Sequence, residues 1–163
     1  MLGEKLAISI KSASQRGAIV LGLQGDLGAG KTTFLQGFAK GLGIKEKILS
    51  PTFVIYKKFK INIVPKNERS FIFWHKYFYH FDCYRINKPE EILELGFREI
   101  VSNPKNIVAI EWSKRIKKLL PKNLILIKFR FIDKNPDGEA IEDPRRNRDK
   151  REILFCIKTS HKV

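Results

Sequence analysis

The sequence of 163 residues predicts an α/β fold with a mixed, mainly parallel central sheet flanked by helices. Three observations support this fold class. An apolar strand over residues 18–23 runs into a glycine-rich loop, and a helix over 32–40 leaves that loop, as in strand–loop–helix units of parallel sheets. The short apolar run 106–112 indicates a buried central strand. Residues 124–132 and 152–159 alternate like paired strands.

The N-terminal segment predicts an amphipathic helix. Leu2, Leu6, Ile10 and Ala13 fall on one helical stripe, and Gly17 marks the expected end of the helix. A stripe at this spacing is typical of a helix that packs one face on a core.

The middle of the chain predicts two strands and a connection between them. We expect a strand over 54–61, a loop or hairpin over 63–70, where proline, asparagine and charges gather, and a long aromatic strand over 71–81. The alternation of aromatic residues favours one buried face of a hairpin. The aromatic and basic stretch 56–79 would also suit a base-stacking strip on a charged face.

The second half of the chain predicts short helices and a polar excursion. Residues 87–91 (Asn-Lys-Pro-Glu-Glu) indicate a helix start, because Asn or Lys can cap the helix, proline suits the first turn and acids suit the positive end of the helix dipole. Ser113 is expected to cap a basic helix over 114–120. Residues 134–150 are charged and almost without apolar side chains, which indicates a loop excursion.

Length and composition exclude several classes of protein. The chain suffices for one core, so we expect a single domain over 1–163. No apolar run reaches the roughly 18 residues that span a bilayer, and the N-terminus lacks a signal-peptide pattern. Two cysteines, Cys83 and Cys156, indicate reduced thiols in a cytoplasmic protein. The net charge of +15 favours an anionic partner such as nucleic acid, or reflects a generally basic proteome.

Residues 25–32 read Gly-Asp-Leu-Gly-Ala-Gly-Lys-Thr, the G-x-x-x-x-G-K-[ST] pattern of a Walker A loop, so the fold class is that of a P-loop NTPase. The glycines let backbone N–H groups approach a phosphate, and the helix N-terminus adds positive charge. We expect Lys31 to reach the β- and γ-phosphates and the Thr32 hydroxyl to ligate Mg²⁺. The expected nucleotide contacts in this segment are Asp26, Leu27, Gly28, Ala29, Gly30, Lys31, Thr32 and Thr33.

Asp82 and Glu111 are the acids expected to complete the site. Each closes an apolar strand, and ligands of open α/β sheets lie beyond the carboxyl ends of the strands. We expect these acids to hold Mg²⁺ together with Thr32, or to position water, and they are candidate catalytic residues together with Lys31. Each acid could instead cap its strand or pair with an arginine. Asp26 either orients water or Mg²⁺ or ties the loop to its own backbone.

Other motifs carry weaker signals. Residues 80–83 (His-Phe-Asp-Cys) would suit half of a metal site, but no second ligand pair has suitable spacing. The basic runs 114–115 and 145–148 could supply a transition-state cation or touch RNA, although such runs are usually solvated surface.

The order of several motifs resembles one family. The motifs are GDLGAGKTT at 25–33, SPTF at 50–53, HFDCYR at 80–85, ELG at 94–96 and IEW at 110–112. In this order they resemble the TsaE (YjeE) family, small bacterial P-loop ATPases of tRNA threonylcarbamoyladenosine biosynthesis. The resemblance covers about residues 2–128.

The resemblance implies ATP and Mg²⁺ as cofactors and association with the TsaD and TsaB subunits, which modify adenosine 37 of tRNA. In the family, ATP hydrolysis is thought to reset the TsaD–TsaB complex between turnovers, so the activity would be weak alone and stimulated by partners. By position, Thr33 would contact the α-phosphate side, Thr52 would sense the γ-phosphate, Trp112 would lie beside the site, and Asp82 and Glu111 would be essential. The tRNA would be reached through the complex, or also directly by basic surface.

The sequence departs from the family pattern in three places. From the resemblance we expect the family's usual first strand to have no counterpart ahead of residues 2–13. The stretches 60–76 and 134–150 are longer than usual and are expected to be loop or hairpin excursions. Two other functions stay open: a small-molecule P-loop kinase, and a nucleotide- or RNA-binding module without catalysis.

Overall fold

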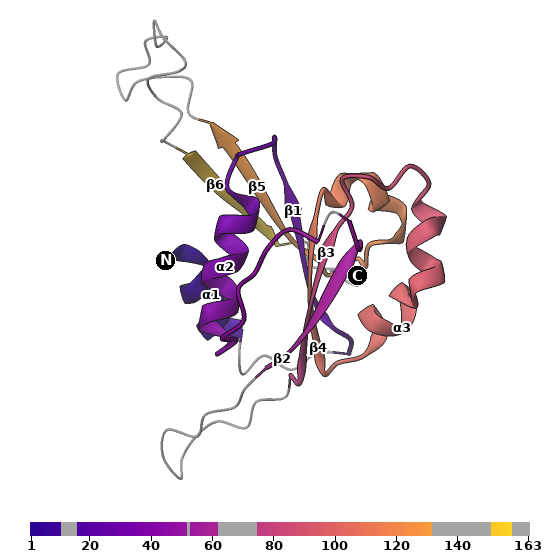
Figure 1. Ribbon diagram of the computed structural model, residues 1–163, viewed down its shortest axis with the longest axis horizontal. Coiled ribbons are helices and arrows are strands. Elements are labelled where there is room, and N and C mark those ends of the chain that lie inside the picture. Colours follow the sequence, from indigo (N-terminus) through magenta and orange to yellow (C-terminus); the bar gives the residue numbers. More distant parts are fainter. Residues whose placement is uncertain (11–15, 52, 62–74, 132–150, 158–163) are drawn as a thin grey trace, which may run out of the picture.

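A computed structural model of the chain describes residues 1–10, 16–51, 53–61, 75–131 and 151–157, with a six-stranded sheet between two layers of helices (Figure 1). The strands are β1 (Ile19–Gln24), β2 (Tyr56–Lys60), β3 (Tyr77–Asp82), β4 (Asn106–Glu111), β5 (Ile125–Phe131) and β6 (Arg151–Ile157). The α-helices are α1 (Leu2–Ile10), α2 (Lys31–Gly41) and α3 (Phe97–Ser102), and the 3₁₀ helices are η1 (Pro89–Leu95) and η2 (Ser113–Leu119).

The strand order is β2-β3-β4-β1-β5-β6. The four inner strands are parallel, whereas the edge strands β2 and β6 run antiparallel to their neighbours. This arrangement confirms the predicted α/β class with a mixed, mainly parallel sheet. Because the inner strands are parallel, their carboxyl ends lie at one end of the sheet, where the loop after β1 also lies.

The alternation of side chains along the inner strands divides the core into two layers. In β1, Leu21 and Leu23 pack in the core under α1 and α2, whereas Val20 packs in the core that includes η1, α3 and η2. Every residue of β4 is buried. Strands covered on both faces are nearly continuous apolar runs, which is why β1 and β4 were predicted correctly.

Helix α1 packs through small residues together with part of the predicted stripe, because Ile10 is buried and Leu6 packs against the core. Its buried residues are Gly3, Ala7 and Ile10. Leu2, which was expected on the buried face, is exposed. A Cβ atom on Gly3 would lie 2.3 Å from the Phe34 carbonyl oxygen, so α1 lies too close to α2 for a larger side chain at that position. Ala13 of the predicted stripe lies outside the described residues.

The strands β2 and β3 are shorter than predicted. β2 begins at Tyr56, because residues 53–54 form a turn and Ile55 has a φ of 63°. A positive φ interrupts an extended strand and is rare for a β-branched residue. β3 begins at Tyr77, and residues 62–74, which include the predicted start of this strand, lie outside the described part of the chain.

The predicted helix after β3 forms as two short helices joined at Gly96. Pro89 is the first residue of η1, and the Glu91 carboxylate accepts a hydrogen bond from the Lys88 backbone N–H at 2.7 Å. The start signal was therefore placed correctly. Gly96 has a φ of 73°, which separates η1 from α3.

Ser113 does not cap the next helix, so that prediction was wrong. Trp112 occupies the N-cap position, whereas Ser113 is buried and its hydroxyl donates to the Leu23 carbonyl oxygen at 3.4 Å. A buried hydroxyl needs an acceptor, and the neighbouring strand provides one. The helix itself is η2, a 3₁₀ helix with a kink at Ile116.

The C-terminal strands agree with the predicted pairing. β5 and β6 form an antiparallel pair in which Ile125 lies opposite Ile157. The excursion predicted over 134–150 lies outside the described residues, as does most of the one over 60–76. No helix among the described residues is long and apolar enough to cross a membrane.

Candidate nucleotide-binding site

Asp82 and Glu111 lie side by side at the carboxyl end of the inner strands. Asp82 is the last residue of β3 and Glu111 is the last residue of β4, and the parallel register pairs them directly. Both are almost fully buried, with 4% and 3% of their surface exposed. The expectation that these strand ends bring the two acids together is confirmed, and their shared role in catalysis stays a prediction.

The loop between β1 and α2 depends on glycine. Gly25 and Gly28 have φ values of 146° and 76°, a region that residues with a Cβ atom rarely adopt. At Gly25 a Cβ atom would also lie 2.5 Å from the Phe129 carbonyl oxygen, whereas at Gly28 the surrounding space is open. The loop ends where α2 begins, at Lys31. A helix N-terminus that follows such a turn favours anions such as phosphate.

Lys31 supplies the positive charge of the site. Its side chain is buried, and Nζ donates to the carbonyl oxygens of Gly25 at 2.8 Å and Asp26 at 2.7 Å. Nζ also lies 4.1 Å from the centroid of the Trp112 ring. Burial lowers the pKa of Lys31, and the nearby carboxylates oppose that shift. A phosphate group would add negative charge beside this ammonium, so the position suits an anionic ligand.

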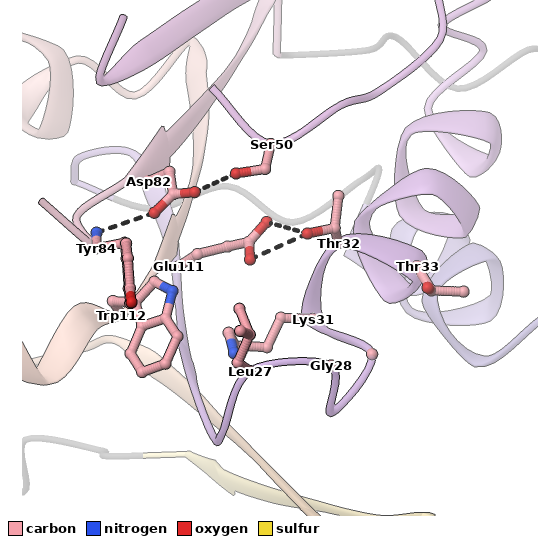
Figure 2. A pocket seen from close by; sticks show the side chains of 11 residues that line it. Leu27, Gly28, Lys31, Thr32, Thr33, Ser50, Asp82, Tyr84, Glu111 and Trp112 are labelled. Carbon is pink, nitrogen blue, oxygen red and sulfur yellow. Dashed lines mark hydrogen bonds between the residues drawn. The ribbon is translucent and has the colours of Figure 1, made fainter. Parts of the chain in front are cut away.

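The Glu111 carboxylate contacts side chains from two other elements. The Thr32 hydroxyl donates to Oε1 at 2.8 Å and to Oε2 at 3.1 Å (Figure 2). The Nε2 atom of His80 lies 2.9 Å from Oε1. The carboxylate is therefore linked both to the start of α2 and to β3.

Asp82 is held by the segments that follow α2 and β3. The Ser50 hydroxyl donates to Oδ2, and the Tyr84 backbone N–H donates to Oδ1 at 2.9 Å (Figure 2). The Tyr84 ring in turn lies 5.1 Å from the Trp112 ring, centroid to centroid. These contacts place the second acid at the wall of the same cavity.

The cavity has a volume of about 420 Å³. It is lined by Leu27, Gly28, Gly30, Lys31, Thr32, Thr33, Ser50, Asp82, Tyr84, Glu111 and Trp112. Most of the predicted nucleotide contacts therefore surround one space. In Figure 2 the Thr33 side chain points away from the two acids.

Two of the predicted nucleotide contacts, Asp26 and Ala29, do not line this cavity, and the position of a third cannot be compared. Asp26 is exposed, and its backbone carbonyl, rather than its carboxylate, accepts a hydrogen bond from Lys31. Ala29 is buried in the hydrophobic core, and its N–H donates to the Asp26 carbonyl at 3.2 Å. Thr52 lies outside the described residues.

Trp112 has a left-handed backbone, with φ 57° and ψ 34°. Such a conformation costs about 1–3 kcal/mol for a residue other than glycine and persists where surrounding contacts hold it. The turn follows Glu111 directly and brings the indole ring over Lys31. The position agrees with the expectation, based on the resemblance, that Trp112 lies beside the site.

Three residues of this site were not predicted from the sequence: Ser50, Tyr84 and His80. Ser50 and Tyr84 stand in motifs beside predicted residues, but nothing in their residue types indicates a bond to Asp82. His80 had a usable signal, because it precedes Asp82 by two residues and strand alternation places both on one face.

The basic pair at 114–115 is partly engaged in structural contacts. The Arg115 guanidinium donates to the Ile86 carbonyl oxygen at 3.0 Å and lies 5.8 Å from the centroid of the Tyr84 ring. It therefore supports the loop that follows Asp82. The second basic run, 145–148, lies outside the described residues.

The oxygen atoms of the site fit a magnesium ion that takes its other ligands from the phosphates of a nucleotide and from water. Thr32, Asp82 and Glu111 offer oxygen atoms, which Mg²⁺ prefers. Within the described residues, no group of three or more His, Cys, Asp or Glu side chains is placed to hold a metal. Mg²⁺ usually keeps several waters and takes phosphate oxygens besides one or two carboxylates, so it does not need such a group.

The chain is similar to one family over most of its length. The family model described as "Threonylcarbamoyl adenosine biosynthesis protein TsaE" matches residues 2–138. A Rickettsia prowazekii protein named tRNA threonylcarbamoyladenosine biosynthesis protein TsaE is 44% identical over 117 residues, which cover 69% of each chain. The Haemophilus influenzae protein of that name is 34% identical over 140 residues, 86% of this chain and 78% of its own.

A solved structure extends this similarity to the fold. The crystal structure of YdiB from Bacillus subtilis has a TM-score of 0.62 and 29% sequence identity, and the match covers 96% of this chain and 79% of that one. Its match, like that of the family model, spans the segment that carries both the phosphate loop and the two acids.

Proposed function

The chain belongs to the TsaE family of threonylcarbamoyl adenosine biosynthesis proteins, and from this membership we propose that it binds ATP with Mg²⁺ and hydrolyses ATP in support of that tRNA modification. One observation carries the proposal: the Thr32 hydroxyl at the start of α2 bonds to Glu111, which lies beside Asp82. Nucleotide binding alone would need only the loop and Lys31. Hydrolysis also needs groups that hold the metal and position water, and the paired acids suit these tasks.

The position of each group in the site indicates its proposed role. The loop N–H groups and Lys31 would hold the β- and γ-phosphates. The Thr32 hydroxyl can keep donating to Glu111 while its oxygen lone pair faces the metal, and Asp82 and Glu111 share the remaining ligation and the orientation of water. Mg²⁺, when bound, would neutralise charge on the phosphate oxygens. We also assign the α-phosphate side to Thr33 and a γ-phosphate contact to Thr52.

The proposed protein partners are the TsaD and TsaB subunits. Large apolar side chains near the cavity support a protein partner, because Phe53 is 84% exposed and Leu27 is 76% exposed. The Arg85 guanidinium lies 4.5 Å from the centroid of the Phe53 ring. Contact at this surface would let the partners act on the nucleotide site, which is why we expect an ATPase that is weak alone and stimulated by its partners.

The charge of the chain supports proximity to tRNA. The net charge is +15, and the edge strand β2 exposes Lys57, Lys58 and Lys60. The Lys58 ammonium lies 3.9 Å from the centroid of the Tyr77 ring. Such lysines would contact phosphates of tRNA, either within the complex or directly. A tRNA partner also places the proposed activity in the cytoplasm.

The proposal is tested by measuring ATP hydrolysis with Mg²⁺, first by this protein alone and then with TsaD, TsaB and unmodified tRNA. We expect slow turnover alone and faster turnover with the partners. Transfer of the γ-phosphate to a metabolite instead of water would favour a kinase. Unchanged hydrolysis on adding the partners would contradict the proposal.

A further inference from the structure

His80 is a buried side chain that belongs neither to the phosphate loop nor to the pair of acids. It is 0% exposed, and its Nε2 atom lies 2.9 Å from Glu111 Oε1. We infer that His80 is a positioning residue, whose Nε2–H group donates to Glu111 and fixes the orientation of this carboxylate. The inference rests on the proposed hydrolysis of ATP.

The sheet register explains how His80 reaches Glu111. His80 and Asp82 lie on the same face of β3, because they are two residues apart. Asp82 pairs with Glu111 in the register. His80 pairs with Ala109, which lies two residues before Glu111 on β4. Because Ala109 carries only a methyl group, the imidazole can extend over β4 and meet Glu111 from the core side.

The environment of the ring assigns its tautomer. The Nδ1 atom of His80 is buried and has no hydrogen-bond partner among the described residues. With the proton on Nε2, only an acceptor lone pair is left unpaired. With a proton on Nδ1, a buried N–H donor would be unsatisfied, which is the more costly arrangement. If Nε2 then carried no proton, its lone pair would also face that of Oε1.

The two oxygens of Glu111 are thereby made unequal. Oε1 accepts from His80 at 2.9 Å and from Thr32 at 2.8 Å, whereas the described contact of Oε2 is the longer one to Thr32, at 3.1 Å. His80 therefore leaves Oε2 as the oxygen most available to the nucleotide side of the site. A rotated carboxylate would lose this arrangement without any change in the loop that binds phosphate.

The test compares two substitutions of His80 with one of His75. His80→Met retains much of the volume and removes the donor, and His80→Gln places an amide N–H near the position of Nε2. His75 is a matched control, because it is also buried, with 1% exposed, but lies before β3 begins. Melting temperatures and ATP dissociation constants are measured for every variant, together with kcat and KM.

We expect His80→Met to lower kcat by about 10–100-fold, the range for residues that orient metal ligands, with the ATP dissociation constant changed by less than about twofold. We expect His80→Gln to recover kcat to within about threefold of the unsubstituted protein, since it restores the donor. We expect His75→Met to leave kcat within about twofold. Equal losses of kcat in His80→Met and His80→Gln would overturn the inference. So would a loss of kcat in His75→Met as large as that in His80→Met.

A second measurement does not depend on turnover or on any variant. Nitrogen-15 NMR of the histidine ring distinguishes a proton on Nε2 from one on Nδ1, and we expect the Nε2–H tautomer at His80. A ring whose single proton is on Nδ1 would overturn the inference even if the protein hydrolyses ATP. Absence of hydrolysis in the unsubstituted protein would instead overturn the proposed function, and the NMR result would still decide the role of His80 toward Glu111.

Discussion

The Thr32 hydroxyl and the Glu111 carboxylate, 79 positions apart in the sequence, are joined by a hydrogen bond of 2.8 Å. The bond connects the start of α2, where the phosphate loop ends, to the end of β4. The phosphate loop and one of the two acids therefore form one hydrogen-bonded unit within the protein itself. A ligand group that contacts the Thr32 hydroxyl would therefore lie close to Glu111.

The first prediction concerns this acid. Glu111→Gln keeps the shape of the side chain and an oxygen that can accept from Thr32, but removes the negative charge. We expect kcat to fall by about 100-fold or more, as for loss of a positioned base, while the ATP dissociation constant changes by less than about threefold. Steady-state hydrolysis and equilibrium nucleotide binding measure the two quantities.

The matched control for Glu111→Gln is Glu99→Gln, because Glu99 is exposed on α3. This control substitution removes the same charge outside the site and is expected to leave both quantities unchanged. Normal turnover in Glu111→Gln would contradict the assignment of this acid.

The second prediction concerns Lys31. Burial lowers the pKa of this lysine, so holding its charge in the folded protein costs free energy that a phosphate ligand would offset. Lys31→Met should therefore melt at the same temperature as the unsubstituted protein or higher without nucleotide. ATP should raise the melting temperature of the unsubstituted protein, because an ATP concentration of 100 times the dissociation constant adds about 2.7 kcal/mol to the free energy of unfolding. ATP should not raise the melting temperature of Lys31→Met.

Thermal unfolding with and without ATP and Mg²⁺ checks both parts of the Lys31 prediction. A lower melting temperature of Lys31→Met without nucleotide would mean that the bonds to the Gly25 and Asp26 carbonyls outweigh the cost of burial. An unchanged rise with ATP would remove Lys31 from the phosphate site.

Local patterns in the sequence account for the central strands and for the position of the acids. β1 and β4 were predicted because strands buried on both faces are nearly continuous apolar runs. Asp82 and Glu111 were placed correctly, because each ends its strand and parallel strands end together. The turns of the loop could be predicted from its glycines, because a backbone with positive φ strongly favours this residue.

Contacts between distant segments could not be predicted in the same way. The bond of Ser113 to β1 and the approach of His80 to Glu111 depend on which strands become neighbours. The left-handed backbone of Trp112 is held by its surroundings and has no signal in the residue type. The buried face of α1 depends on how closely α2 approaches Gly3, which a hydrophobic stripe does not reveal.

The third prediction concerns the two thiols. Cys83 is buried, and burial, together with the nearby charge of Asp82, raises the pKa of its thiol from 9.0 to about 12. Because the thiolate is the reactive form, Cys83 should resist iodoacetamide at about pH 8, whereas the exposed Cys156 should react. Mass spectrometry of the alkylated peptides measures both sites, and unfolding in urea is the control that should make Cys83 reactive.

The same pKa predicts how stability depends on pH. The unfolded thiol loses its proton near pH 9.0, whereas the folded thiol keeps its proton up to about pH 12. The stability from the buried neutral thiol is therefore fully present below pH 9.0 and is lost as the pH rises through about 12. The free energy of unfolding should fall more steeply with rising pH in the unsubstituted protein than in Cys83→Ala. Parallel urea titrations check this, and equal slopes would contradict it.

The last prediction concerns the surface beside the nucleotide cavity. Phe53 is 84% exposed, and we expect it to anchor the partner, because docking would remove this large apolar side chain from water. Phe53→Ser should leave the basal hydrolysis of ATP unchanged, since this side chain does not line the cavity. Half-maximal stimulation should then require about tenfold more TsaD–TsaB, which corresponds to about 1.4 kcal/mol of binding.

The matched control for Phe53→Ser is Ile8→Ser, because Ile8 is 57% exposed on α1. A titration of hydrolysis against the partner complex compares the two variants with the unsubstituted protein. If exposure alone weakened stimulation, both variants would shift the titration equally, and Phe53 would not mark the docking surface. A shift confined to Phe53→Ser would place the partner beside Phe53, three residues after Ser50, whose hydroxyl bonds to Asp82 at the nucleotide site.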